Sequence, residues 1–395
     1  MNYVSKLHKN IQLSYIFNCL LYFRTTNAIW VIYLCFKGIS LTQIGILEAI
    51  FHATSFLFDV PTGALADLFG RRISMVCGRI ASIISAILMM VCDSMWGFSL
   101  AFVFSGLSYT LNSGAGTSLL YDSLVGVGEE WRYTKVAGLI NALGEVAQAV
   151  AVALGGYLAD TSFLYAYIAI LVVDSLAIGV MCKLVEPIIV REQETRRGLI
   201  AHIRESVKVL LATKIALYLM LYLSFIVATS TTVYFYCQKY FEAMHYSYTA
   251  IAILFSIDSL LRAACARYAY IFEEKAEQTK IIVSLLVFVI LGLAGLAMAS
   301  GMWGVVFYYI ISVADGVAYP IFSGYINSLL PSEQRATLLS MESTMFSLGM
   351  IVIFPLVGLL SDSTSLNLAF LVLAIFLGLL VMVLLRFLNF KQRCI

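Results

Sequence analysis

Charged residues are scarce in this sequence. Only 12% of its 395 residues are Asp, Glu, Lys or Arg, and 61% are hydrophobic. A soluble globular domain carries about 25% charged residues, so this composition excludes one. The chain has only five prolines and no polar low-complexity stretch, which argues against disordered tails.

The residue patterns of metal sites and of enzymes are also missing. The eight cysteines are scattered, with no Cys-x-x-Cys pair and no histidine at metal-ligand spacing, so we expect buried free thiols. No nucleophile–base constellation and no phosphate-binding loop is visible. We therefore expect no enzymatic activity, no cofactor, no metal, no nucleic-acid partner and no direct use of ATP.

What the sequence does contain is a series of long apolar runs. Each is continuous and close to the roughly 20 residues that cross a bilayer as a helix, which indicates helices and not barrel strands. The first run has no basic segment and cleavage site of a signal peptide, and it carries Asn18, Arg24 and Asn27, so we expect it to be retained. The predicted spans are 11–36, 43–64, 73–92, 97–121, 136–158, 163–184, 215–237, 247–270, 281–300, 303–329, 338–360 and 366–387. These twelve runs predict an all-α integral membrane protein in a lipid bilayer.

The positive charges predict how these spans are oriented. Of the 25 Lys and Arg residues, Arg24, Arg79 and Arg262 lie in the interior of spans, and only Lys37 and Lys239 lie in the loops that join odd to even spans. The other twenty lie in the remaining loops, in the two termini or, for Lys183, Arg267 and Arg386, within the last four residues of a span beside them. Cytoplasmic loops carry the excess of Lys and Arg, so we expect both termini in the cytoplasm.

The sequence repeats across its midpoint. Residues 156–160 (Gly-Tyr-Leu-Ala-Asp) match residues 358–362 (Gly-Leu-Leu-Ser-Asp) at a spacing of 202 residues. Residues 132–134 and 335–337, and residues 121–124 and 326–329, match at 203 and 205. We therefore predict two pseudo-symmetric six-helix bundles, residues 1–185 and 215–395. A cytoplasmic linker with an amphipathic helix is predicted at residues 186–214.

One charged loop between the second and third spans carries the most specific pattern. Residues 63–72 read Gly-Ala-Leu-Ala-Asp-Leu-Phe-Gly-Arg-Arg. This Gly-x-Leu-Ala-Asp-x-x-Gly-Arg-Arg pattern resembles the signature loop of the major facilitator superfamily of transporters. The lead-in at residues 59–63, Asp-Val-Pro-Thr-Gly, is similar to that of bacterial drug-efflux-like members. The resemblance implies the twelve-helix fold of that superfamily and a place in the bacterial inner membrane.

The resemblance also implies a conformational latch on the cytoplasmic side. In such transporters the loop arginine pairs with an aspartate at the inner end of the fourth helix, a position that Asp122 occupies here. Arg79 is a second possible partner. Two glycines would permit a tight turn and close helix approach. The implied latch residues are Gly63, Asp67, Gly70, Arg71, Arg72 and Asp122.

Ionisable residues inside the spans are the candidates for coupling. A charge at mid-bilayer costs about 2.5–3.5 kcal/mol even on insertion scales, so each is a functional candidate. Asp315 has no basic residue within a helical turn and is our first candidate for proton coupling, followed by Glu48 and Glu145. Asp174 is expected to contact another helix.

The resemblance places spans one, two, four, five, seven, eight, ten and eleven around a central substrate cavity. Arg24 could bind an anionic group or serve as counter-ion to an acid, and Asp258 and Arg262, four residues apart, could form a structural pair. Tyr236, Tyr240 and Tyr308 are expected at membrane interfaces. The cavity candidates are Arg24, Tyr109, Asn112, Tyr234, Asp258, Arg262 and Tyr319.

The functional hypothesis is a secondary transporter working by alternating access. We expect it to act as a monomer and to export a small organic molecule in exchange for protons. Antiporters of the superfamily often carry a Gly-Pro-x-x-Gly-Gly ending in the fifth span. Here Gly155 and Gly156 keep the final pair, but Ala151 and Val152 replace Gly-Pro, which weakens the hypothesis of export by antiport. The alternatives are proton-linked uptake of a nutrient or anionic metabolite and, from another class, a non-transporting receptor or assembly subunit.

Overall fold

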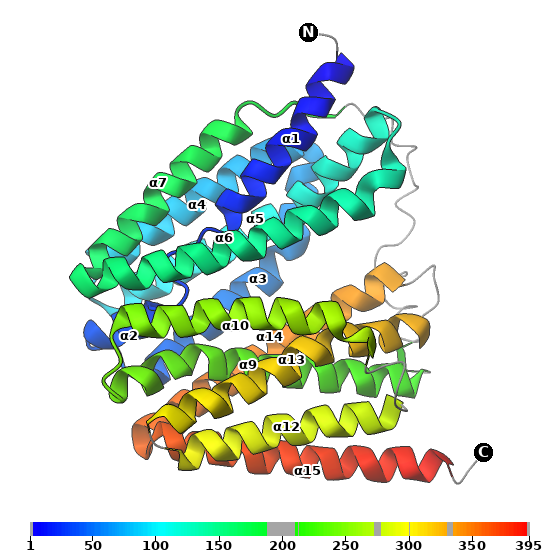
Figure 1. Cartoon of the computed structure of the whole chain (residues 1–395). Coiled ribbons are helices and arrows are strands. Elements are labelled where there is room, and N and C mark those ends of the chain that lie inside the picture. Colours follow the sequence, from blue (N-terminus) through cyan, green and yellow to red (C-terminus); the bar gives the residue numbers. More distant parts are fainter. Residues whose placement is uncertain are drawn as a thin grey trace. The chain divides into compact units, whose positions relative to one another are not determined.

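A computed structural model of the chain describes residues 3–187, 210–211, 213–271, 278–299, 301–329 and 335–392. The described residues form helices joined by short turns (Figure 1). The helices are α1 (Tyr3–Tyr22), α2 (Trp30–Phe36), α3 (Leu41–Phe69), α4 (Arg71–Val91), α5 (Met95–Gly126), α6 (Tyr133–Thr161), α7 (Phe163–Met181), α9 (Lys214–Ala243), α10 (Tyr248–Tyr268), α12 (Gln278–Met298), α13 (Met302–Leu329), α14 (Arg335–Ser363) and α15 (Leu366–Gln392). A single 3₁₀ turn, Glu130–Arg132, precedes α6.

The helices follow the apolar runs of the sequence. Each predicted span from the second to the twelfth coincides with one helix, in order from α3 to α15. Nine helices of the described ranges are long and apolar enough to cross a membrane. The predicted linker at 186–214 and its amphipathic helix lie largely outside the described residues, so the boundaries at 185 and 215 stay predictions.

The first span differs from its prediction, because it is not one helix. The chain leaves the helical path after α1 and resumes it in α2. In between, the Thr25 hydroxyl donates to the carbonyl oxygen of Ala166 on α7 at 2.7 Å. Thr and Asn side chains can hydrogen-bond to backbone groups and so compete with the backbone hydrogen bonds that continue a helix. Gly155 on α6 allows the close approach, since a Cβ atom built there would lie 1.7 Å from the Thr25 carbonyl oxygen.

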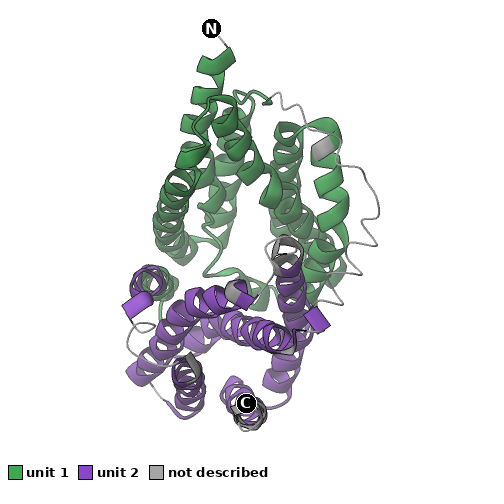
Figure 2. Cartoon of the chain, turned by 90° about the vertical axis from the view of Figure 1, so that its right-hand side faces the viewer, with its two compact units in different colours: residues 1–39, 46–196, 245–259 green, residues 40–45, 197–244, 260–395 purple. Residues whose placement is uncertain are grey.

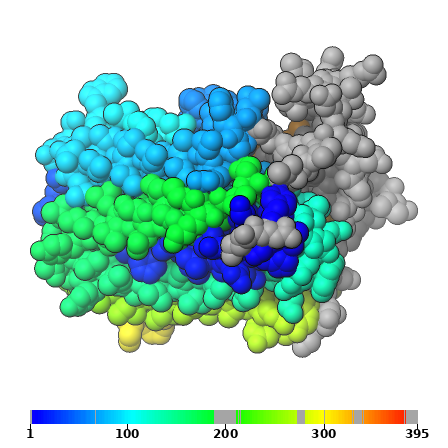
Figure 3. Space-filling view, turned by 90° about the horizontal axis from the view of Figure 1, so that it is seen from above, coloured from blue at the N-terminus to red at the C-terminus, as the bar shows by residue number. Residues whose placement is uncertain are grey.

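One compact unit comprises residues 1–39, 46–196 and 245–259 (green in Figure 2). Within it, α4 packs against α5 and α7, and α1 packs against α5, α6 and α7. Figure 3 shows α7, in green, lying across one face beside α4. One of its apolar clusters joins Leu13 and Phe17 of α1, Met75 of α4 and Leu119 of α5.

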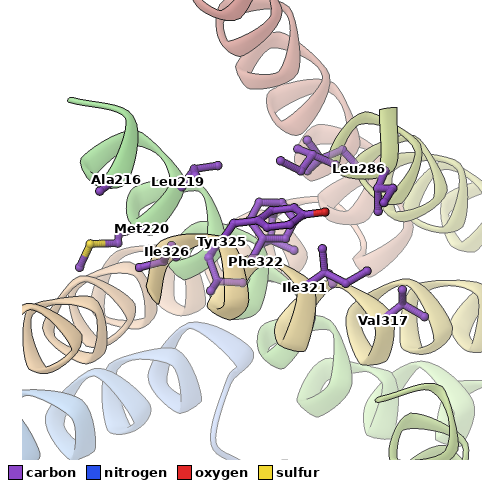
Figure 4. Close-up of a cluster of buried hydrophobic side chains, with 14 of the residues drawn as sticks. Ala216, Leu219, Met220, Leu286, Val317, Ile321, Phe322, Tyr325 and Ile326 are labelled. Atoms are coloured by element: carbon purple, nitrogen blue, oxygen red, sulfur yellow. The ribbon is translucent and has the colours of Figure 1, made fainter. Parts of the chain in front are cut away.

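The other compact unit comprises residues 40–45, 197–244 and 260–395 (purple in Figure 2). Its helix α12 packs between α13 and α15, and α9 packs against α13 and α14. A buried apolar cluster joins Met220 of α9, Leu286 of α12 and Phe322 of α13 (Figure 4). Burial of such side chains stabilises this unit.

Two helices are divided between the units. The first turn of α3, within residues 40–45, belongs with the second unit, although the rest of α3 belongs with the first. In the same way, residues 248–259 of α10 belong with the first unit and the remainder of α10 with the second. Both divided segments are therefore helix beginnings that group with the unit formed mainly by the other half of the chain.

The break in the first span yields a stability prediction. Gly155→Ala would place its methyl group against the Thr25 backbone, and overpacking of this kind costs about 1–3 kcal/mol. We expect a lower thermal unfolding midpoint for the detergent-solubilised protein.

The matched control for this substitution is Gly138→Ala, on the same helix. A Cβ atom built at Gly138 would meet no described atom within 4 Å apart from the backbone of its own helix and its chain neighbours. Alanine at that position should raise helix stability by about 0.5–1 kcal/mol. Equal midpoints for the two variants would contradict the close contact at Gly155.

Candidate functional site

The signature loop makes a tight turn between α3 and α4. Gly70 has a φ angle of 96°, a left-handed conformation that favours glycine, and α4 begins at the next residue. The Arg71 guanidinium contacts the Asp122 carboxylate of α5, and both side chains are buried. The pairing implied by the resemblance is therefore present in the structure, whereas its role as a latch stays a prediction.

A Cβ atom built at Gly63 would meet no described atom of another helix within 4 Å, so close helix approach at Gly63 stays a prediction. The side chain of Asp67 lies outside the described residues. Arg79, the second possible partner of Asp122, pairs instead with Asp174.

Glu186 is a part of this site that the sequence reasoning missed. Its Oε1 accepts a hydrogen bond from the backbone N–H of Arg71 at 2.8 Å, and its Oε2 accepts one from the N–H of Arg72 at 3.1 Å. A carboxylate in this position satisfies free donors of the helix and interacts favourably with its dipole. The only sequence signal is that Glu186, followed by Pro187, opens the polar linker.

A buried charge network connects the break in the first span to three helices. The Asp174 carboxylate of α7 lies 3.1 Å from the Arg79 guanidinium of α4 and 3.5 Å from that of Arg24. Arg24 also donates to the Ser82 hydroxyl at 2.8 Å, and Arg79 donates to the Ser108 hydroxyl of α5 at 3.2 Å. The expected contact of Asp174 with other helices is confirmed. Only Arg24 is substantially accessible, with 29% of its side chain exposed against 1% for each of the other two.

A second charged pair lies in the other unit. The Arg262 guanidinium of α10 donates to Oδ2 of Asp315 on α13 at 3.1 Å. The Arg262 guanidinium also lies over the Tyr234 ring of α9, 5.4 Å from its centroid. These three residues line a small cavity together with Ser230 and Ser312. The view of Asp315 as an acid without a basic partner is therefore wrong, because its partner comes from another helix.

The remaining coupling candidates have different surroundings. Glu48 is buried on α3 and lies 3.5 Å from Nε2 of His52, one turn further along the same helix. His52 was missed, although its i,i+4 spacing from Glu48 was readable from the sequence. Glu145 is half-buried on α6, and Asp258 is fully buried on α10.

The polar and aromatic cavity candidates divide into buried and exposed groups. Asn112 and Tyr234 are buried, and the Asn112 amide donates to the Ser108 carbonyl oxygen at 2.7 Å. Tyr109 and Tyr319 are more than half exposed. The structure thus joins Tyr234, Arg262 and Asp315 into one site.

The tyrosines expected at membrane interfaces are instead packed inside the protein. Tyr236, Tyr240 and Tyr308 are 0%, 3% and 2% exposed. The Tyr236 hydroxyl lies 3.0 Å from the carbonyl oxygens of both Leu41 and Phe354. Their assignment to the membrane interface is therefore wrong, since all three side chains are buried in the protein, where the hydroxyl groups of Tyr236 and Tyr240 donate to backbone carbonyl oxygens.

Comparison with known proteins identifies the family. The family model of the Major Facilitator Superfamily matches residues 13–341. The chain belongs to this superfamily. This confirms the resemblance of the signature loop and shows that the protein is a transporter and not an enzyme. Members of the superfamily bind small-molecule substrates within a membrane.

A curated relative and three solved structures extend the comparison. An uncharacterized MFS-type transporter of Bacillus subtilis (strain 168), YxaM, is 23% identical over 365 residues, which cover 89% of this chain and 88% of the relative. A mutant form of the nucleoside transporter NupG has a TM-score of 0.80 at 14% identity, covering 98% of this chain and 99% of its own. A D-xylose-proton symporter has a TM-score of 0.71 at 14% identity, covering 93% and 96%.

The third structure is a bacterial homolog of the human lysosomal transporter Spinster in an inward-facing, unoccupied conformation. Its TM-score is 0.75 at 14% identity, and the match covers 95% of this chain and 96% of that one. At such identities these three structures show the fold alone. The predicted twelve-helix fold of the superfamily is confirmed.

The buried charge network of this transporter yields a second stability prediction. Asp174→Asn would leave two guanidinium groups without their carboxylate. Breaking a buried ion pair costs about 3–5 kcal/mol, so we expect a strongly lowered thermal midpoint in detergent and low yield.

Asp93→Asn is the matched control, since Asp93 forms an exposed ion pair. Its carboxylate accepts a hydrogen bond from Nζ of Lys37 at 2.6 Å, which raises the pKa of Lys37. Surface pairs of this kind contribute about 0–1 kcal/mol. If Asp93→Asn destabilised the protein as much as Asp174→Asn, the network would not have the structural role described here.

Proposed function

We propose that this transporter couples the movement of a small organic compound to protons through the Arg262–Asp315 pair. The observation that carries the proposal is the contact between these two charges, at 3.1 Å, on two helices that we expect to line the substrate cavity. An ionisable group inside a membrane span is a candidate for a proton or substrate pathway. Protonation of Asp315 would remove its charge and release Arg262, which links proton binding to a change in contact between α10 and α13.

Tyr234 extends this pair toward a third helix. Its ring lies under the Arg262 guanidinium and stabilises the cation whether or not Asp315 is ionised. Arg262 therefore has a second partner on α9 when the acid is protonated. Asp315 can lose its charge by protonation, and Arg262 then keeps its contact with Tyr234. This arrangement suits a coupling site.

The direction that we propose is export. It is supported by the lead-in at residues 59–63, which is similar to that of drug-efflux-like members. Pro61 lies inside the continuous helix α3, and the Thr62 hydroxyl donates to the carbonyl oxygens of Phe58 at 2.7 Å and Asp59 at 3.1 Å. The turn around the proline is thus stabilised by a side chain of the same motif.

Proton-linked uptake is the second candidate, and one observation favours it. Arg24 is the accessible member of the buried charge network, at the break in the first span, where an anionic substrate group could reach it. Interrupted membrane helices are common at the binding sites of secondary transporters. The fold similarity to a D-xylose-proton symporter is compatible with the same direction.

Measuring proton movement on addition of substrate tests both the proton coupling and the direction of transport. Everted membrane vesicles are given an acidic interior, which a pH-sensitive dye reports, and a panel of antibiotics, cationic dyes, nucleosides and pentoses is added. An exported compound should collapse the gradient, because it enters the vesicle as protons leave. Asp315→Asn should abolish this collapse.

Glu242→Gln is the control for this experiment, since Glu242 forms a local pair with Lys239 at the end of α9. It should leave the collapse unchanged. Compounds that acidify the interior of right-side-out vesicles, and have no effect in everted ones, would show uptake in place of export. Substrate-driven proton movement that persists in Asp315→Asn would refute Asp315 as the coupling acid.

A further inference from the structure

The Asp160 carboxylate, near the end of α6, caps the beginning of α10. It accepts hydrogen bonds from the backbone N–H groups of Tyr248 at 2.9 Å and Thr249 at 3.0 Å, and from the Thr249 hydroxyl. The first N–H groups of a helix have no partner within it, and an aspartate that accepts from them stabilises the helix end. Here the capping residue comes from another helix, 88 residues away in the sequence.

The Asp362 carboxylate, near the end of α14, caps the beginning of α3 in the same way. It accepts from the N–H groups of Leu41 at 3.1 Å and Thr42 at 2.7 Å, and from the Thr42 hydroxyl at 2.6 Å. The capping aspartate and the capped helix are 320 residues apart. Each aspartate thus makes three equivalent bonds to two consecutive residues.

An equivalent close contact between helix backbones lies beside each of the two caps. A glycine stands four residues before each aspartate, at Gly156 and Gly358. A Cβ atom built at Gly156 would lie 2.5 Å from the Tyr248 carbonyl oxygen, and one built at Gly358 would lie 2.3 Å from the Leu41 carbonyl oxygen. Both glycines therefore let a helix backbone approach the first residue of the capped helix.

The sequence repeat accounts for this correspondence. The aspartates and glycines belong to the repeated segments 156–160 and 358–362, and the capped residues follow a serine in both Ser-Tyr-Thr (247–249) and Ser-Leu-Thr (40–42). The divided helices agree with it, because the capped beginnings of α10 and α3 group with the unit that holds their capping aspartate. Two halves of one chain thus carry the same arrangement of residues.

We propose that Asp160 and Asp362 form a pair of equivalent clasps that hold the outer ends of the transport pathway closed. This inference rests on the proposed function, and "outer" follows the orientation predicted from the positive charges. Each clasp joins a helix of one sequence half to a helix of the other, α6 to α10 and α14 to α3. Alternating access moves the halves against each other, so the clasps must break when the outer ends separate.

The clasps suit a reversible contact. Both aspartates are exposed to the surroundings, and the N–H groups that they leave can bond to water at a helix end. Opening therefore does not strand a buried charge, in contrast to what separation of Asp174 from Arg79 would do. Loss of a clasp should shift the population toward the open state without unfolding the bundles.

Thiol labelling from outside the cell tests this proposal. Ala252 of α10 is fully buried, and a Cβ atom built at Gly156 would lie 2.2 Å from its Cβ, so Ala252→Cys reports separation of these two helices. Intact cells are treated with a membrane-impermeant maleimide. A protein without the Ala252→Cys substitution is treated in parallel to measure labelling of the native cysteines. Asp160→Asn and Asp362→Asn should each speed labelling several-fold, and the double substitution should speed it further.

Two further variants keep the result interpretable. Asp93→Asn changes another exposed aspartate of the same predicted side and should leave labelling unchanged. Thr249→Val removes one of the three bonds to Asp160 and should produce a smaller increase, which covers the case in which Asp160→Asn does not fold. Lower thermal stability with unchanged labelling would assign the two aspartates a purely structural role and overturn the proposal, as would labelling that increases only from the cytoplasmic face.

The labelling experiment uses neither substrate nor proton gradient. Faster labelling in the clasp variants, combined with no substrate-driven proton movement in the vesicle experiment, would support the clasps and reject the proton coupling. Unchanged labelling in a protein that moves protons with substrate would reject the clasps alone.

Discussion

The ion pair between Asp174 and Arg79 is the interaction on which the first unit most depends. Both side chains are 1% exposed, and the pair joins α7 to α4, with α5 and the break in the first span attached through Ser108 and Arg24. A buried charge in an apolar protein is tolerated only when it is paired and hydrogen-bonded. The pair therefore constrains how these helices pack, and it places Arg24 where part of its side chain remains accessible.

The second unit also pairs its charges inside an apolar protein, but its pair is less buried. Arg262 and Asp315 are more accessible than Arg79 and Asp174, with 32% and 12% of their side chains exposed. Arg262 has an aromatic ring as a second contact. One charged pair is thus enclosed and suited to holding helices together, whereas the other lines a cavity, where we propose that it binds and releases a proton.

Carboxylates at helix beginnings form a second theme. Glu186 accepts from the first residues of α4, Asp160 from those of α10 and Asp362 from those of α3. Each joins the end of one helix, or the segment that follows it, to the start of another. In a chain with so few charged residues, three of its acids are used to bond helix ends that would otherwise lack partners. The Asp160 and Asp362 bonds each join helices of different sequence halves, which move against each other if the protein alternates between two states.

The local sequence alone determined the helices, the family and one contact of the site. Long apolar runs predicted eleven spans that coincide with single helices, because span length is set by the bilayer. The signature loop predicted the Arg71–Asp122 pairing, since both residues belong to a recurrent motif. Only the tertiary structure decided the partners of Asp174, Asp315, Glu186, Asp160 and Asp362. Those partners lie tens to hundreds of residues away, and hydropathy and periodicity report which face of a helix is apolar but not which helix it meets.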